Sequence, residues 1–484
     1  MKREIVGIFV MMLLITTAVL PVVGTMNVCT IETSKGIDDK SIFTAPLFNV
    51  IPNDAYFNEQ WALDNTGQTG GTNGCDIDAP EAWEIETGNG DVVVAIIDSG
   101  IDYTHPDLVN KIWTNEDEIP DNDIDDDNNG YIDDYHGYDF KNNDGDTLDE
   151  HGHGTVIAGV IGAETNNNIG IAGICWYCQI MPLKIWNTDA RTEIYMDRIE
   201  NIIGAIEYAA DNDANVISMS FGAIEEFFTI EEFIQFKDAI DYAYSKGCIL
   251  VAAALNEDTS DPYYPAAWSN VICVAGTDHN DNRMEYQYPN HGQIVISNYG
   301  DWVDVAAPGE EIFTTSPTYD CVLTLLGREY DYTLMSGTSL STPHVAGLVA
   351  LLVSKNPTYS QEKIMDIVKA NVDPYDSTYD LGTGRINVYK ALTEFNVAPN
   401  KPETPTGPTS GKPDTEYTFS TSTIDPDGDT VSYMWDWGDA NFSEWLETSE
   451  ASYSWGQKAK FNISVRAKDI YGAESDWSDS SCQS

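Results

Sequence analysis

Short, almost wholly apolar runs alternate with segments of helical periodicity in the middle of the chain. The runs are too continuous for half-exposed strands, which alternate between apolar and polar residues, so we expect strands buried on both faces. Two longer segments, Arg198–Asn212 and Ile230–Lys246, carry apolar residues at helical spacing. The expected strands are Val92–Ile97, Gln179–Ile185, Asn215–Ser220, Cys248–Ala254 and Val271–Ala275.

Strands that alternate with helices predict an α/β domain with a mostly parallel sheet flanked by helices on both faces. We place this domain at residues 52–396. Such a sheet carries its functional groups beyond the carboxyl ends of its strands. Side chains that follow the apolar runs are therefore the first candidates for a site.

The pattern changes near Val397. Residues 397–412 are rich in proline and predict an extended, fairly stiff linker. Beyond it, Val431–Trp437 and Phe461–Lys468 alternate and are separated by turn-forming clusters, which predicts a small all-β immunoglobulin-like sandwich at residues 413–484.

The charge balance narrows the range of partners. Among 484 residues, 24 Lys and Arg face 79 Asp and Glu, a net charge of −55. Nucleic acid is excluded as a partner because phosphate binding needs clustered cations. The charge fits a soluble exported protein, and adaptation to salty or divalent-rich water and solubility alone explain it equally well.

The N-terminus has the pattern of an export signal. Lys2 and Arg3 precede the apolar run Ile5–Val23, and small residues follow at Gly24. The alternative is an uncleaved membrane anchor, because the run is almost long enough to span a bilayer. We favour a cleaved signal peptide at residues 1–24, hence a secreted, extracellular protein with no membrane contact after cleavage. Residues 25–51 are then a short pro-segment or linker.

Eight cysteines are consistent with an oxidising compartment. Cys175 and Cys178 are close enough in sequence to pair. A thioredoxin-like redox site is the sharper hypothesis, but the βαβ pattern expected around such a site is missing. A short structural disulfide or two free thiols is therefore favoured. Cys248 and Cys273 lie in strand-like runs and are expected to be buried.

Three short motifs suggest chemistry. Asp98 ends a predicted strand, His153 opens a helix of small residues, and Ser339 lies between a glycine turn and an apolar helix. Each residue alone would have a structural explanation, as a turn residue, a packed histidine or a helix cap. The surrounding sequences are Asp98-Ser-Gly, His153-Gly-Thr and Gly337-Thr-Ser-Leu-Ser-Thr-Pro343.

Together these motifs resemble the subtilisin-like serine peptidases (subtilases, thermitase-like) from about residue 52 to 392, in the order Asp, His, Ser. The resemblance implies a serine endopeptidase that hydrolyses extracellular proteins through an acyl-enzyme. Ser339 would be the nucleophile, His153 the general base, and Asp98 the group that orients the histidine.

The same resemblance implies further site residues. Asn256 occupies the place of the oxyanion-hole asparagine, although Leu255 stands where the family commonly has glycine. Tyr263 falls where the family lines its main specificity pocket, and a large ring there favours small or medium side chains. The expected substrate-binding residues are Ser220, Phe221, Gly222, Ala254, Leu255 and Tyr263.

Acidic loops predict structural calcium. Residues 121–134 place oxygen ligands at alternate positions before Gly130, as a hard cation requires. Two more sites follow from the resemblance, whereas zinc is not indicated because no His-Glu-x-x-His occurs. The expected ligands are Asp125, Asp127, Asn129 and Asp133 in the first site, Asp139, Asp144 and Asp146 in the second, and Asp54, Asp107 and Asn167 in the third.

The run Trp435-Asp-Trp-Gly-Asp439 resembles PKD-type domains, which implies a spacer or a binder of matrix, protein or polysaccharide.

An inactive binding protein is the alternative from another class, and the four expected catalytic residues argue against it. A limited-processing peptidase stays open, since the segments 282–296 and 320–331 would narrow the cleft. The short pro-segment leaves open whether the enzyme needs it, folds unaided with calcium, or uses a separate chaperone.

Overall fold

The computed structural model describes residues 50–483 apart from 121, 188–198, 290–291, 376–377, 394–397, 427–428 and 470–471. The predicted signal peptide, almost all of the predicted pro-segment and the first residue of the predicted linker lie outside the described residues. Within the described ranges, no helix is both long and apolar enough to cross a membrane.

A nine-stranded sheet forms the centre of the first domain, in the order β12-β13-β9-β6-β5-β4-β1-β3-β2. Its strand pairings are parallel except the one between β12 and β13, which confirms the predicted fold class. Its longer strands are β1 (Val93–Asp98), β3 (Gln179–Lys184), β4 (Val216–Met219), β5 (Ile249–Ala253), β6 (Val271–Thr277) and β9 (Val305–Pro308).

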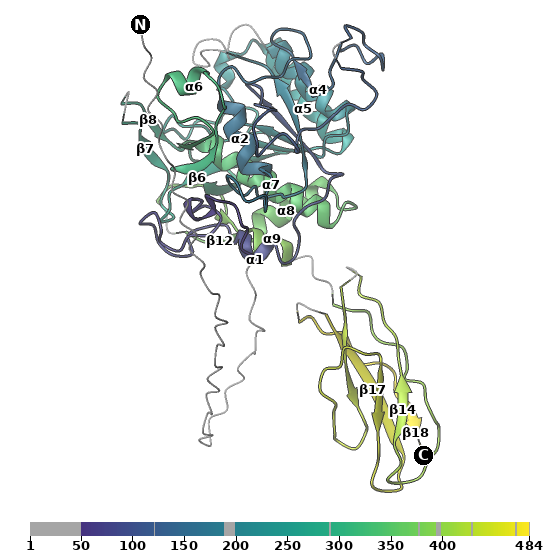
Figure 1. Cartoon of the computed structure of the whole chain (residues 1–484). Helices are drawn as coiled ribbons and strands as arrows, with labels where there is room; N and C mark the ends of the chain where they lie inside the picture. Colours follow the sequence, from purple (N-terminus) through teal and green to yellow (C-terminus); the bar gives the residue numbers. More distant parts are fainter. Residues whose placement is uncertain are drawn as a thin grey trace, which may run out of the picture. The chain divides into compact units, whose positions relative to one another are not determined.

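Two hydrophobic cores cover the two faces of this sheet. Successive residues of β1 alternate between them, with Val94 and Ile96 in one core and Ala95 and Ile97 in the other. Because both faces are buried, the strand shows no polar alternation. The first core includes α2 (His153–Gly162) and α7 (Thr338–Lys355), and the second includes α4 (Ile199–Asp211) and α5 (Ile230–Lys246). Figure 1 shows this domain with its helices α2, α4, α5 and α7.

Shorter elements complete the domain around the sheet. β7 and β8 form a separate antiparallel pair, as do β10 and β11. The helical elements are η1 (Phe57–Glu59), α1 (Ala79–Ala82), η2 (Glu225–Phe227), α6 (Val322–Leu325), α8 (Gln361–Ala370) and α9 (Val388–Thr393). The short strands are β2 (Tyr138–Asp139), β7 (Glu285–Gln287), β8 (Ile294–Ile296), β10 (Ile312–Thr315), β11 (Tyr332–Met335), β12 (Val372–Asp373) and β13 (Arg385–Ile386).

The C-terminal module is a small antiparallel β structure, as predicted. β14 (Tyr417–Ser420) pairs with β16 (Glu450–Tyr453), while β17 (Phe461–Lys468) lies between β15 (Ser432–Asp436) and β18 (Ser481–Gln483). Its core contains the two tryptophans that the alternation places on one face, Trp435 and Trp437.

Helix α5 shows how local sequence sets an element's bounds. Thr229 Oγ1 accepts a hydrogen bond from the Glu232 amide, and the Glu232 carboxylate accepts one from the Thr229 amide, which closes a capping box. Gly247 ends the helix in the left-handed conformation. The observed helix therefore matches the predicted Ile230–Lys246 at both ends.

Replacing Thr229 with alanine should lower the free energy of unfolding by about 1 kcal/mol, because the first turn of α5 loses its side-chain acceptor. Urea unfolding of the full chain measures the change. Thr229→Ser keeps the hydroxyl and serves as the control, with stability close to wild type. Equal stability of the alanine variant and wild type would contradict the role of this cap.

Candidate active site

Asp98 and His153 form the centre of the site. Asp98 is the last residue of β1 and is 2% exposed, and its Oδ1 accepts the Ser99 amide at 2.7 Å. His153 is the first residue of α2, and its Nδ1 lies 2.8 Å from Asp98 Oδ1 and 2.9 Å from Oδ2. The carboxylate therefore fixes the orientation of the imidazole ring through one of its two nitrogens.

The surroundings of His153 act on its pKa in two directions. Burial lowers the pKa, but the charge and hydrogen bond of Asp98 outweigh it, so the pKa of His153 lies above its ordinary value of 6.5. Trp186 lies beside this ring, with the two ring centroids 5.8 Å apart. The site thus favours the charged imidazolium that a general base must become.

Asp149 holds the start of α2, the helix that begins at His153, and it was missed by the sequence analysis. It is wholly buried, and its carboxylate accepts hydrogen bonds from the Ser99 hydroxyl at 2.8 Å, the Gly152 amide at 2.7 Å and the Thr155 hydroxyl at 2.6 Å. Ser99 Oγ in turn accepts the Gly154 amide. Asp149 therefore joins the end of β1 to the first turn of α2.

Ser339 lies in the first turn of α7, beside the end of β4. Its carbonyl accepts the Ser220 hydroxyl at 3.1 Å, and its own Oγ lies 3.5 Å from the Ser220 carbonyl. β4 pairs with β1 in a register that places Met219 beside Ile97. Asp98 and Ser220, which follow Ile97 and Met219, therefore lie beside each other at the carboxyl ends of adjacent strands. Ser339, which contacts Ser220, lies at the same edge of the sheet as Asp98.

Asn256 faces the same helix start from the end of β5. Its side-chain Oδ1 accepts the Thr338 amide at 2.9 Å. Among the described residues, no acceptor is hydrogen-bonded to its Nδ2, which is left to donate to a ligand. The Ser339 amide belongs to the first helical turn, whose amides lack intrahelical partners. The two donors suit a negatively charged oxygen at this point.

The predicted substrate-binding residues lie on segments that are far apart in sequence. Ala223 and Tyr264 exchange two backbone hydrogen bonds, and a Cβ built on Gly222 would lie 2.9 Å from the Tyr264 carbonyl oxygen and 3.6 Å from Leu255 Cδ1. The segments around 222, 255 and 264 therefore lie together. The Phe221 side chain belongs to the core instead, so that residue offers backbone groups. The pocket role of Tyr263 stays a prediction.

Asp54, Asp107 and Asn167 are brought together although they lie far apart in sequence. Asn167 donates to Asp107 Oδ1 at 2.7 Å through its amide group and to Asp54 Oδ1 at 3.3 Å through its backbone. Burial raises the pKa of Asp54, as does the charge of Asp107. Neither carboxylate contacts a lysine or arginine of the described chain. Two buried like charges with further oxygen atoms nearby fit a calcium ion.

Next to the acidic loop 121–134 lies a carboxylate that the sequence analysis missed. Carboxylate oxygens of Glu118, Asp125 and Asp127 lie within 4.8 Å of one another. Glu118 is 3% exposed, and its Oε2 has no hydrogen-bond partner among the described groups. Asp133 instead accepts the amides of residues 122 and 123, and Asn129 Nδ2 donates to Asp127. Glu118 therefore lies with Asp125 and Asp127, whereas the Asp133 carboxylate is engaged with backbone amides.

The predicted site at Asp139, Asp144 and Asp146 has a different arrangement. Asp139 Oδ2 lies 3.0 Å from the ammonium group of the buried Lys184. Asp144 accepts the amide of Asp146, whose Oδ1 accepts the Tyr103 hydroxyl at 3.2 Å. A side-chain cation already balances Asp139, so these residues are not retained as a calcium site.

Cys175 and Cys178 are buried beside each other, with Cys178 Sγ 3.4 Å from the Cys175 carbonyl oxygen. Both are thiols in this structure, as are the other cysteines whose side chains are described. Of the alternatives from the sequence, the structure therefore holds two free thiols. Cys248 and Cys273 are buried, as predicted.

Comparisons with known proteins agree with this geometry. Residues 89–395 match the subtilase family and residues 403–481 match the PKD domain. The chain is 34% identical to the thermophilic serine proteinase of Bacillus sp. (strain AK1), covering 73% of this chain and 75% of the relative. It is also 34% identical to thermitase of Thermoactinomyces vulgaris, covering 70% and 99%. A solved protease from Pseudoalteromonas arctica PAMC 21717 superposes with a TM-score of 0.54 at 27% identity, covering 71% and 99%.

The chain belongs to the subtilase family and carries a C-terminal PKD domain. It is a serine-type endopeptidase. The predicted family, fold class and enzyme class are thereby confirmed.

The pH dependence of the free energy of unfolding should show the titration of Asp149. Burial raises the pKa of Asp149 from 3.8 to about 6, so the folded state binds this proton more tightly than the unfolded chain. Stability from this group is then present below about pH 4 and lost as pH rises through about 6. At 1.36 kcal/mol per unit, the loss is about 3 kcal/mol.

Asp149→Asn removes this titration. The free energy of unfolding, measured in urea from pH 4 to 7, should fall for wild type relative to the variant as pH rises. A difference that does not change with pH would contradict the prediction.

Proposed function

We propose that Asp98, His153 and Ser339 form the catalytic triad of a secreted, calcium-stabilised endopeptidase. The single observation that carries the proposal is the pair of short distances from His153 Nδ1 to the Asp98 carboxylate. With Nδ1 held there, Nε2 is the nitrogen that serves the substrate side. Ser339, at the same sheet edge, supplies the hydroxyl.

The proposed reaction uses these groups in two stages. His153 Nε2 takes the Ser339 proton as the oxygen attacks the peptide carbonyl, then gives that proton to the leaving amine as the acyl-enzyme forms. A water molecule attacks the acyl-enzyme in the reverse sense, and His153 again accepts and returns a proton. Asp98 holds the tautomer of the ring and stabilises its charged form throughout.

Asn256 Nδ2 and the Ser339 amide would bind the oxyanion of each tetrahedral intermediate. The backbone at residues 220–222 would pair with an extended peptide, so unfolded segments and loops are the proposed substrates. Tyr263 would limit the pocket to small or medium side chains.

Calcium would be structural. Asp54, Asp107 and Asn167 would hold one ion, and Glu118, Asp125, Asp127 and Asn129 a second. Bound calcium would neutralise buried carboxylates that the described chain leaves without a cation. Its contribution to stability follows mass action, about 2.7 kcal/mol when the free ion is 100-fold above Kd.

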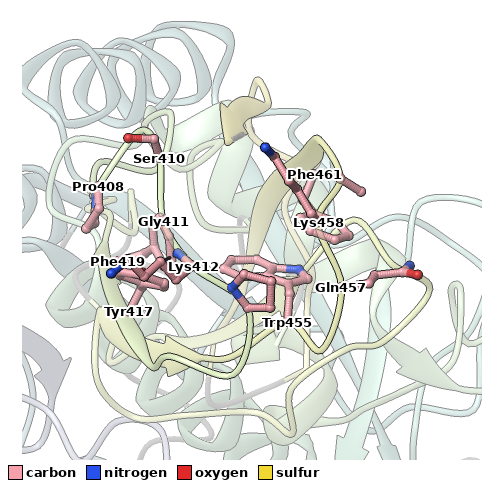
Figure 2. A pocket seen from close by; sticks show the side chains of 12 residues that line it. Pro408, Ser410, Gly411, Lys412, Tyr417, Phe419, Trp455, Gln457, Lys458 and Phe461 are labelled. Atoms are coloured by element: carbon pink, nitrogen blue, oxygen red, sulfur yellow. Dashed lines mark hydrogen bonds between the residues drawn. The ribbon is translucent and has the colours of Figure 1, made fainter.

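The remaining proposals concern organisation and partners. We place the signal peptide at residues 1–24, the peptidase domain at 52–396 and the PKD-type domain at 413–484, and we propose secretion. The PKD-type domain would bind matrix, protein or polysaccharide. Figure 2 shows a pocket between this module and the end of the linker, with a mainly aromatic and aliphatic lining and with Lys412 of the linker and Lys458 of the module.

Ser339→Ala should abolish hydrolysis of casein, with a loss of at least about 10⁴-fold in kcat, because no nucleophile remains. The assay uses purified full chain in calcium and high salt, with and without a serine-directed inhibitor. Ser354→Ala, at the other end of α7, is the matched control and should keep wild-type activity. Inhibitor-insensitive hydrolysis, or hydrolysis by Ser339→Ala, would contradict the triad, while a folded but inert wild type would favour a binding protein.

Glu118→Gln should weaken calcium binding by at least about tenfold, because the site loses a charged ligand. The measurement is the melting temperature as a function of free calcium, after removal of the ion with a chelator. The midpoint of the stabilisation should move to higher calcium in this variant. Asp146→Asn is the control and should leave the midpoint unchanged; an unchanged midpoint in Glu118→Gln would exclude Glu118 as a ligand.

A further inference from the structure

Asn298 packs against the turn at residues 254–259, which carries Asn256. It follows β8, and the segment that contains it runs beside this turn, with a parallel bridge between Glu257 and Ile296. The residue is wholly buried. A buried carboxamide is costly unless its groups are hydrogen-bonded, so its partners indicate what it does.

Every polar group of the Asn298 side chain bonds to this turn. Its Oδ1 accepts the amides of Glu257 at 2.8 Å and Thr259 at 3.2 Å. Its Nδ2 donates to the Ala254 carbonyl at 2.8 Å and to Glu257 Oε2 at 3.2 Å. The backbone amide of Asn298 also donates to the Leu255 carbonyl at 2.8 Å. Asn298 is therefore hydrogen-bonded both to the residues before Asn256 and to the residues after it.

The turn needs such support because its backbone is strained. Leu255 has a φ of +71°, in the left-handed region, which costs a residue with a Cβ about 1–2 kcal/mol. Such a conformation persists where the surrounding structure determines it. Here it turns the chain so that the next side chain, Asn256, meets the start of α7.

We propose that Asn298 is a positioning residue for the oxyanion donor Asn256, an inference that rests on the proposed function. Asn298 holds the turn in the conformation that aims Asn256 Nδ2 at the developing oxyanion. A donor acts there at about 2.7–3.1 Å, so relaxation of the turn by about 1 Å removes much of its effect. The effect falls on the transition state more than on substrate binding.

The test compares kcat and KM of full-length variants on a soluble chromogenic peptide. Asn298→Ala should lower kcat about 10- to 100-fold and change KM by less than about threefold. Asn387→Ala is the matched control, since Asn387 is equally buried and bonds Asp78, Asp373 and the Lys390 amide. It should lower the melting temperature but leave kcat near wild type.

A double-mutant cycle with Asn256 separates positioning from general destabilisation. Asn256→Ala should lower kcat about 10²–10³-fold, a magnitude known from an enzyme of this family. If Asn298 acts through Asn256, the double variant should be no slower than Asn256→Ala alone. Additive losses, or full kcat in Asn298→Ala, would overturn the inference.

Two further measurements keep the result decisive. Asn298→Ser retains a small hydroxyl in the turn and goes through the same cycle if the alanine variant does not fold. Labelling of wild type by a serine-directed reagent is measured in parallel. If wild type neither hydrolyses the peptide nor is labelled, the proposed function fails and the inference with it. If wild type is active but the Asn298 variant keeps full kcat and shows no coupling to Asn256, only the inference is refuted.

Discussion

The register of the parallel sheet is the constraint on which the site depends. β1, β4 and β5 are adjacent and parallel, so the residues that follow them emerge at one edge. Asp98, Ser220 and Asn256 reach that edge although more than 150 residues of chain separate the first from the last. Ser339 joins them because α7 packs in the core beside the same strands. A shift of one residue in any pairing would point these side chains to the other face.

Register alone does not fix the side chains to the accuracy that catalysis requires. Two buried polar residues, Asp149 and Asn298, join neighbouring segments at the points where the backbone leaves regular structure. Asp149 is hydrogen-bonded by backbone amides and hydroxyls, and Asn298 by backbone groups and the Glu257 carboxylate. These bonds offset part of the burial cost while the loop loses its freedom. The polar interior at this edge therefore serves orientation, whereas the apolar cores supply most of the stability.

The sequence predicts the sheet because strands buried on both faces leave continuous apolar runs, and it predicts α5 because its caps are local. The motifs at Asp98, His153 and Ser339 carry the family resemblance directly. Asn298 and Glu118 escape prediction because no local pattern marks them. The side-chain partners of Asn298 lie at least 39 residues away, and those of Glu118 at least 7. A single buried asparagine or glutamate has many structural explanations until its neighbours are known.

The acidic residues show the same limit, and the structure resolves it. Asp139 looks like a calcium ligand in sequence, yet β2 pairs with β3 so that Asp139 lies opposite Lys184, and the ammonium neutralises it. Asp54 and Asp107 are buried to a similar degree without such a partner in the described chain. Burying two unbalanced carboxylates side by side opposes folding, since each disfavours ionisation of the other. Within the described chain the fold supplies a lysine to Asp139 and none to Asp54 or Asp107, and the proposed calcium ion would supply the missing positive charge there.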